Sequence, residues 1–187
     1  MTKAYESGRK TTGSSRESDE PNSADSPGSF LSELVFWAEY DYVLENWLGV
    51  GLEGHTPESV MEIFKKNPRE IFPFGVEGCD EFVDGARCRL VQAIPLLLDS
   101  NGWVTVSTTD TSVRFVVDSY GYFDGPGSTI EFSVIENSEG LVLRQEAHAI
   151  NVDFVAAAGV EAGLVRIPWA TQAANLREAI LTHGGEK

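Results

Sequence analysis

The alternation of apolar and polar residues between about Glu77 and Ile150 constrains the fold of this chain more than any other feature. Successive side chains of a β-strand point to opposite faces, so a two-residue repeat is typical of strands with one buried face. The repeat occurs in five runs, at Ala86–Ile94, Trp103–Thr109, Val113–Asp118, Thr129–Val134 and Leu141–His148. These runs follow one another through short turns with no helix between them, which predicts an antiparallel sheet.

Helical signals flank the predicted sheet. Thr56 is a capping residue and Pro57 takes the first helical position, so a helix is expected to begin there and to end before Pro68. A C-terminal helix is predicted at Ala170–Leu181, where alanine and aliphatic residues recur at helical spacing. The aromatic segment Ser29–Trp47 is also predicted to be helical, because its apolar residues recur at nearly the same spacing.

The N-terminal residues 1–28 have a different composition from the rest of the chain. They are rich in Ser, Gly and charged residues, and they contain Tyr5 but no Leu, Ile, Val or Phe. Such a segment buries too little apolar surface to offset its conformational entropy, which predicts a disordered, polar and acidic tail. Residues 29–187 then fit a single α+β domain, because domains commonly contain roughly 100–200 residues.

The charge balance narrows the classes of partner. Asp and Glu number 29 against 14 Lys and Arg, which gives a formal net charge of −15. Binding to nucleic acid needs clustered basic residues, so a nucleic-acid partner is not expected. A basic protein would be attracted, although the same charge also supplies solubility. The N-terminus has no apolar signal segment and no stretch is long enough to insert into a membrane, so a cytoplasmic location is predicted.

Several short motifs accompany the order of the predicted elements. They are Thr56-Pro57-Glu58-Ser59-Val60, Asn67-Pro68, Phe72-Pro73-Phe74 and a glycine followed by a strand at residues 85–90. From about Gly54 to Leu181 the chain resembles the helix-grip superfamily, which includes the START, Bet v 1 and polyketide-cyclase-like domains. The resemblance implies a curved antiparallel sheet of at least five strands that packs on a C-terminal helix and encloses a cavity. A strand usually precedes the capped helix in this superfamily, whereas here the aromatic segment stands in that place.

Two glutamines are candidates for contact with a ligand in such a cavity. Gln92 and Gln145 share the parity of the inward apolar residues on their strands. A buried glutamine must form hydrogen bonds, with a ligand or ordered water in a cavity and with backbone groups in a solid core. Trp103, Tyr120 and Trp169 are the candidate aromatic walls of the same ligand-binding site.

Candidates for catalysis and for metal binding are few. His148 lies on a predicted strand and shares a face with Glu146, and such a pair could perform acid–base chemistry. The alternative is that both residues lie on the solvated side of a half-exposed sheet. Cys79 and Cys88 fit no zinc or redox motif, and we expect two buried thiols rather than a disulfide across a hairpin. No metal or cofactor is expected.

Three functions remain open. The first is a domain that binds a small apolar or amphipathic molecule in the cavity between sheet and helix. The second is a cyclase-like or dehydratase-like enzyme that uses the same cavity, which would need an inward titratable side chain that the strand parity does not supply. The third is an acidic interaction module for a basic partner. The aromatic segment Ser29–Trp47 has too many large side chains for one face, which also predicts a homodimer contact or closure of one end of the cavity.

Overall fold

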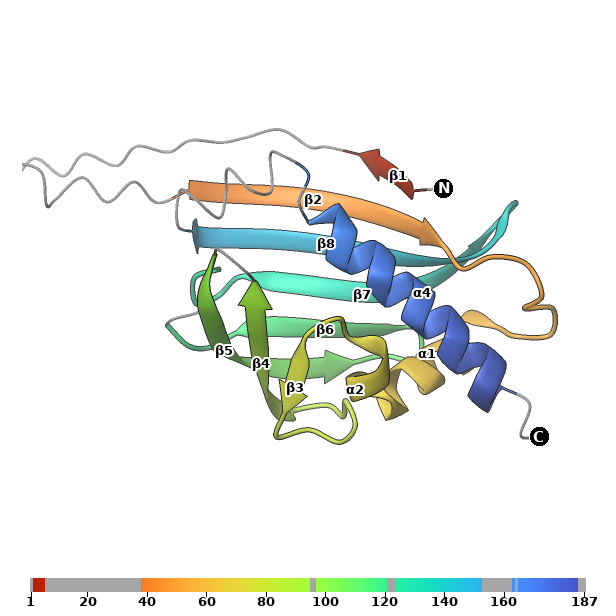
Figure 1. The fold of residues 1–187 in the computed structure, drawn as a ribbon, viewed down its shortest axis with the longest axis horizontal. Coiled ribbons are helices and arrows are strands. Elements are labelled where there is room, and N and C mark those ends of the chain that lie inside the picture. The colour runs from red at the N-terminus through yellow and green to blue at the C-terminus, as the bar shows by residue number, and fades with distance from the viewer. Residues whose placement is uncertain are drawn as a thin grey trace, which may run out of the picture.

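The computed structural model describes residues 2–5, 38–94, 97–120, 124–152, 163 and 165–184. Within these residues, eight strands form one antiparallel sheet in the order β1-β2-β8-β7-β6-β5-β4-β3. The helices lie on one face of this sheet, and the strand direction turns between β2 and β3, so that the sheet curves around them (Figure 1). The fold predicted from the sequence, a curved antiparallel sheet packed on a C-terminal helix, is confirmed.

The elements follow the chain in a simple order. The strands are β1 (Thr2–Tyr5), β2 (Ala38–Trp47), β3 (Gly75–Glu77), β4 (Arg87–Ile94), β5 (Leu97–Thr108), β6 (Ser112–Val117), β7 (Thr129–Asn137) and β8 (Gly140–Val152). The helices are α1 (Pro57–Lys66), α2 (Pro68–Ile71) and α4 (Arg166–His183). From β3 to β8 each strand pairs with the next one along the chain, as expected for short connections. None of the helices in the described part of the chain is long and apolar enough to cross a bilayer.

β2 replaces the helix that the sequence predicts at Ser29–Trp47, and that prediction is wrong for residues 38–47. Tyr42, Leu44 and Asn46 are buried, whereas Val43 and Glu45, which alternate with them, are more exposed, as in a strand with one buried face. Aromatic residues stand at both parities along this segment and hide its two-residue repeat, although aromatic residues themselves favour strands. Residues 29–37 lie outside the described part of the chain.

β1 extends the sheet by one strand at the edge of β2. It pairs antiparallel with β2, and Ala4 stands opposite Leu44. The strand falls within the segment for which the sequence predicts a disordered tail. Backbone hydrogen bonds to an open sheet edge need no apolar side chains, which is why composition gives no sign of such a strand. The other residues of the predicted tail lie outside the described part of the chain.

α1 begins where its capping residues predict, whereas α4 begins earlier than predicted. The side chain of Thr56 accepts a hydrogen bond from the backbone of Ser59, and the Ser59 side chain reaches back to the Thr56 backbone, which fixes the start of α1. α4 begins at Arg166, earlier than the predicted Ala170, and includes Pro168. Proline is tolerated there because the first turn of a helix has no intrahelical partners for its N–H groups.

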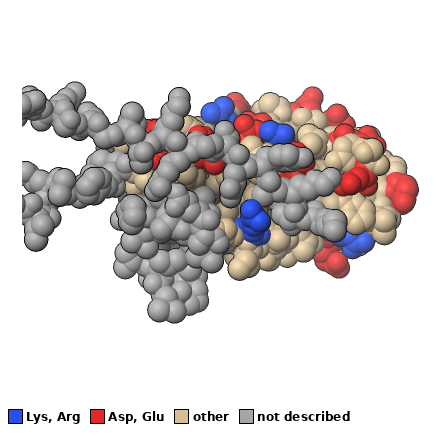
Figure 2. Space-filling view, turned by 90° about the horizontal axis from the view of Figure 1, so that it is seen from above, with Lys and Arg blue, Asp and Glu red and all other residues tan. Residues whose placement is uncertain are grey.

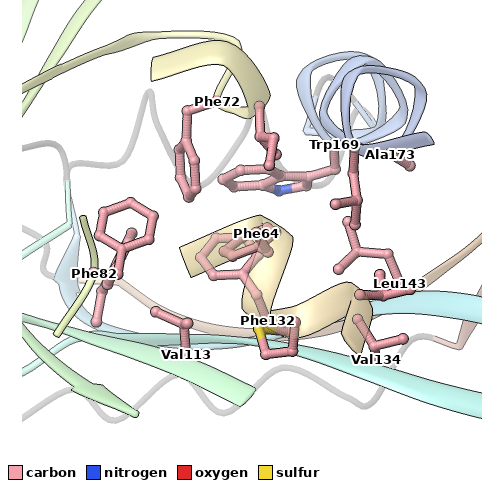
Figure 3. Close-up of a cluster of buried hydrophobic side chains, with 14 of the residues drawn as sticks. Phe64, Phe72, Phe82, Val113, Phe132, Val134, Leu143, Trp169 and Ala173 are labelled. Carbon is pink, nitrogen blue, oxygen red and sulfur yellow. The ribbon is translucent and has the colours of Figure 1, made fainter. Parts of the chain in front are cut away.

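Phenylalanine side chains fill the interface between the sheet and helices α1 and α2 (Figure 3). Phe64 of α1 contacts Phe132 of the sheet, and Phe82 of the loop before β4 contacts Phe115, with ring centroids 5.6 and 5.0 Å apart. Phe64 and Phe82 also contact each other, at 6.1 Å, as do Phe115 and Phe132, at 5.5 Å. Trp169 of α4 packs against Phe132 at 5.4 Å. The buried face of α4 continues this core with Ala173, Leu176 and Ile180, and Gln172 lies among these apolar residues.

A disulfide between Cys79 and Cys88 joins the loop after β3 to β4. The expectation of two free thiols is therefore wrong. The loop folds back on the strand, so the two Cα atoms lie 5.4 Å apart, within the range that a disulfide bridges. The bond anchors the loop that carries Phe82 into the core, where its side chain is 1% exposed.

Candidate ligand-binding site between the sheet and the C-terminal helix

A chain of three buried amides crosses the interface between the sheet and α4. Asn46 of β2 donates from Nδ2 to Oε1 of Gln145 on β8 at 2.9 Å. Gln145 in turn donates from Nε2 to Oε1 of Gln172 on α4 at 3.3 Å. Within the described residues, Nε2 of Gln172 is buried and has no hydrogen-bond partner. The amide chain therefore ends in an unused donor at the inner face of the helix.

Tyr42 and Trp169 form a second polar contact at the same interface, one turn of α4 before Gln172. The indole nitrogen Nε1 of Trp169 donates to the Tyr42 hydroxyl at 2.8 Å, and both side chains are buried. Burial raises the pKa of Tyr42 far above its usual range, so the hydroxyl is neutral at physiological pH. Because its oxygen accepts the bond from Trp169, the hydroxyl proton is still available to a ligand.

Asp124 adds a carboxyl group next to these two residues. The Tyr40 hydroxyl donates to Oδ1 of Asp124 at 2.5 Å, and the Tyr40 ring stacks on that of Tyr42 with centroids 5.9 Å apart. Burial raises the pKa of Asp124 to about 6, and the hydrogen bond from Tyr40 offsets part of that rise. The carboxyl group is thus partly protonated near neutral pH, as a general acid or base would be.

The turn that follows Asp124 is held against the end of β8. Gly125 donates its backbone N–H to the Ile150 carbonyl at 3.0 Å, and a Cβ at this glycine would lie only 2.6 Å from the same oxygen. Only glycine allows so close an approach, so this residue determines where Asp124 is placed. Strand parity does not apply to a turn, so the sequence pattern gives no sign that Asp124 lies against Tyr40.

A groove runs between the end of β2 and the neighbouring face of α4. Its volume is about 240 Å³, below the roughly 300–1,000 Å³ typical of sites for drug-sized ligands. The lining residues are Asn46, Trp47, Leu48, Gly49, Ala170, Ala173, Ala174 and Arg177. Asn46 belongs both to this lining and to the amide chain, so the groove borders the buried polar groups at that residue. Its size suits a small molecule.

The structure brings together two of the five predicted ligand-binding residues. Gln145 and Trp169 lie at the interface beneath α4 and are both buried. Trp103 is 37% exposed on the opposite face of the sheet, where the Arg87 guanidinium lies 4.9 Å from the centre of its ring. Its neighbours Val104 and Val106 point inward, so the parity of β5 places Trp103 outward.

The remaining two predicted ligand-binding residues lie away from the amide chain. Tyr120 follows β6 and is 90% exposed, so it forms no wall of the interface. Gln92 lies on β4 opposite Ser100, and its side chain is outside the described part of the structure. β4 stands near the other edge of the sheet, several strands from β2 and β8.

The predicted catalytic pair lies on the outer face of the sheet. His148 and Glu146 are both exposed, and Nδ1 of His148 lies 2.7 Å from Oδ1 of Asp41 on β2. They line a shallow outer groove of about 530 Å³ together with Arg114 and Glu131. The solvated-face alternative therefore describes their position, and neither faces the interface beneath α4. Within the described residues, no group of three or more His, Cys, Asp and Glu could hold a metal ion.

Comparison with known proteins supports the fold. No protein-family model and no curated protein matches this chain. Among solved structures, norcoclaurine synthase from Thalictrum flavum, in complex with dopamine and hydroxybenzaldehyde, is 11% identical with a TM-score of 0.53, over 88% of this chain and 98% of that one. The di-domain ARO/CYC StfQ from the steffimycin biosynthetic pathway is 10% identical with a TM-score of 0.54, over 79% of this chain and 52% of that one.

A third solved structure is a protein of unknown function, SA2116 from Staphylococcus aureus. It is 12% identical with a TM-score of 0.53, over 80% of this chain and 98% of that one. The chain therefore has the helix-grip fold, also called the Bet v 1-like fold, as its motifs indicate. At these identities the likeness concerns the fold alone, because one fold hosts many unrelated functions.

Proposed function

We propose that the protein binds a small, mostly apolar molecule between α4 and strands β2 and β8. The observation that carries this proposal is the Gln172 amide nitrogen, which is buried without a hydrogen-bond partner in the described residues. Leaving a buried donor unpaired costs about 1–3 kcal/mol. A ligand that places a carbonyl or hydroxyl oxygen at this nitrogen would remove that cost, and the Tyr42 hydroxyl could donate a second hydrogen bond.

The surroundings of Gln172 favour a ligand that is small and mostly apolar. Leu44, Ala173 and Leu176 are buried beside the amide chain, and the phenylalanine cluster fills the interface beneath the other helices. A ligand would be restricted to the side of β2 and β8, where the groove already reaches Asn46. Norcoclaurine synthase, which shares the fold, holds dopamine and hydroxybenzaldehyde, and by analogy this supports a ligand of similar size.

The proposal can be tested by screening the full-length protein against a library of small fragments by NMR. We expect fragments that bear a carbonyl or hydroxyl group to shift the indole N–H signal of Trp169. The Gln172→Leu variant should lose these shifts, whereas Thr171→Val, on the exposed face of the same helix, should keep them. If no fragment moves the Trp169 signal, or if Gln172→Leu binds as well as the wild type, the proposal is wrong.

A cyclase-like or dehydratase-like enzyme is the second candidate function, and Asp124 is the observation that favours it. The enzyme hypothesis needs an inward titratable group, and a carboxyl group with a pKa of about 6 beside Tyr40 meets that need. Native mass spectrometry of freshly purified wild type and Asp124→Asn would separate binding from catalysis. A dehydration predicts that the variant retains a molecule heavier by one water than the molecule in the wild type. If the wild type and Asp124→Asn hold a molecule of the same mass, the protein binds its ligand without dehydrating it.

Two other predictions gain no specific support. Acidic and basic side chains lie intermixed on the face shown in Figure 2, a distribution that solubility explains as well as a basic partner does. The homodimer prediction rested on an aromatic helix at Ser29–Trp47, and β2 occupies its described part, so that argument no longer holds. The cytoplasmic location stays a prediction.

A further inference from the structure

We propose that the ligand of this site is a small carboxylic acid whose carboxylate pairs with Arg177, at the groove between α4 and the end of β2. The inference rests on the proposed binding of a small molecule beneath α4, and it adds the chemical class of that molecule. The position of the Arg177 guanidinium group and the apolar lining beside it support this class of ligand.

The Arg177 side chain is held against the loop that follows β2. Its Nη2 donates to the Val50 carbonyl at 3.1 Å, and the guanidinium stem lies directly over Gly49. Another residue at position 49 would be strained, because the backbone φ is +98°, and its Cβ would lie 2.6 Å from Nε of Arg177 and displace the guanidinium. One hydrogen bond to the backbone thus positions the group and leaves other N–H donors for an anion.

Arg177 has no carboxylate partner within 4.0 Å among the described residues, on a chain with twice as many acidic as basic residues. Two other arginines of the domain have carboxylate partners: Arg69 pairs with Asp80, and Arg87 pairs with Asp118. A half-buried guanidinium without a counter-ion, in so acidic a protein, favours an anionic occupant of the groove beside it.

The rest of the groove suits the apolar body of such an acid. Trp47 forms one wall, and its indole Nε1 donates to the Glu139 carbonyl at 2.8 Å, which fixes the ring while leaving it 39% exposed. Ala170, Ala173 and Ala174 of α4 are small residues that leave room opposite this wall. An acid whose carboxylate lies at Arg177 would therefore extend its apolar body into the groove of about 240 Å³, which Asn46 also lines.

Phenylacetate and phenylacetamide are suitable probes, because they have nearly the same size and differ in charge. In an NMR titration of the full-length protein, both should shift the indole N–H signal of Trp47. We expect the acid to bind about tenfold more tightly than the amide, since a charge-assisted hydrogen bond is about twice as strong as a neutral one. Arg177→Gln should abolish this preference. Arg114→Gln, which removes the same charge from the outer face of the sheet, should preserve it.

Equal affinity for the two probes, a preference that survives in Arg177→Gln, or an equal loss in Arg114→Gln would overturn the inference. Failure of both probes to bind at millimolar concentration would also overturn it. Equal binding of acid and amide that Gln172→Leu abolishes would reject the carboxylate while supporting the proposed interior site. Acid binding that depends on Arg177 but is unaffected by Gln172→Leu would support the carboxylate site and count against the interior one.

Discussion

Replacement of Asp124 by asparagine should change how the stability of the protein depends on pH. The carboxyl group lies against the Tyr40 hydroxyl in a partly buried position, and burial raises its pKa from an ordinary value of 3.8 to about 6. An asparagine keeps an oxygen that can accept the Tyr40 hydrogen bond, but it does not titrate. The variant therefore removes the ionisation of this one group with little change in shape.

The sign and size of the effect follow from the two pKa values. The folded state binds the Asp124 proton more tightly than the unfolded state, so the contribution of this group is fully present below about pH 4 and is lost as pH rises through about 6. A shift of about two units corresponds to about 3 kcal/mol at most, since each unit is worth about 1.4 kcal/mol. Wild type should therefore lose up to about 3 kcal/mol relative to Asp124→Asn between acidic and neutral pH.

Urea unfolding of both proteins is followed by tryptophan fluorescence at about pH 4.5 and about pH 7.5. These conditions should show about 2 kcal/mol of the difference, because the carboxyl group of the unfolded chain is already mostly ionised at about pH 4.5. Other titrating groups are common to the two proteins, including Asp118 and Glu62, whose pKa values are lowered by Arg87 and Lys66. Their contributions cancel when the variant is compared with the wild type. If the difference in the free energy of unfolding between variant and wild type is the same at both pH values, the burial argument for Asp124 is wrong.

Three further predictions concern stability, and each can be measured by urea unfolding. Replacing both Cys79 and Cys88 by serine should lower the free energy of unfolding by about 2–3 kcal/mol, because the bond closes a loop between residues nine positions apart; an unchanged midpoint would contradict this. Phe132→Ala should cost about 3–5 kcal/mol, because its ring is fully buried among other aromatic rings, and a loss below about 1 kcal/mol would show that the cluster is loosely packed. A double-mutant cycle of Tyr42→Phe and Trp169→Phe should show a coupling of about 1 kcal/mol from their hydrogen bond, and strictly additive effects would argue against that bond.

The parts of the fold that could be predicted from sequence are those with local signals. Strand β6 shows its two-residue repeat within six residues, and Thr56 and Pro57 mark the start of α1 within one turn. β2 was missed because the partner that defines it as a strand, β8, lies about a hundred residues further along the chain. Pro168 hid the start of α4 because proline usually ends a helix, and only its place in the first turn makes it acceptable.

Residues of the candidate site could be predicted only on strands, where the alternation of side chains shows which of them point inward. Gln145 was found because it lies on a strand whose inward residues are otherwise apolar, and its burial agrees with that reasoning. Gln172 and Arg177 lie on a helix, where the sequence does not show which strand or loop each residue will meet. Asp124 lies in a turn, and its burial results from the close contact of Gly125 with the end of β8. These three depend on tertiary contacts.

The pairing of β2 with β8 has a consequence for the synthesis of the chain. A ribosome completes β2 about a hundred residues before β8, so one edge of this aromatic strand lacks its partner until most of the domain has been made. Such a strand would invite association with other nascent chains. Asp41 and Glu45 alternate with its apolar residues and leave a charged face that opposes such association. Because Gln145 lies on β8 and Trp169 and Gln172 lie on α4, the polar groups beneath α4 can come together only after most of the chain has been synthesised.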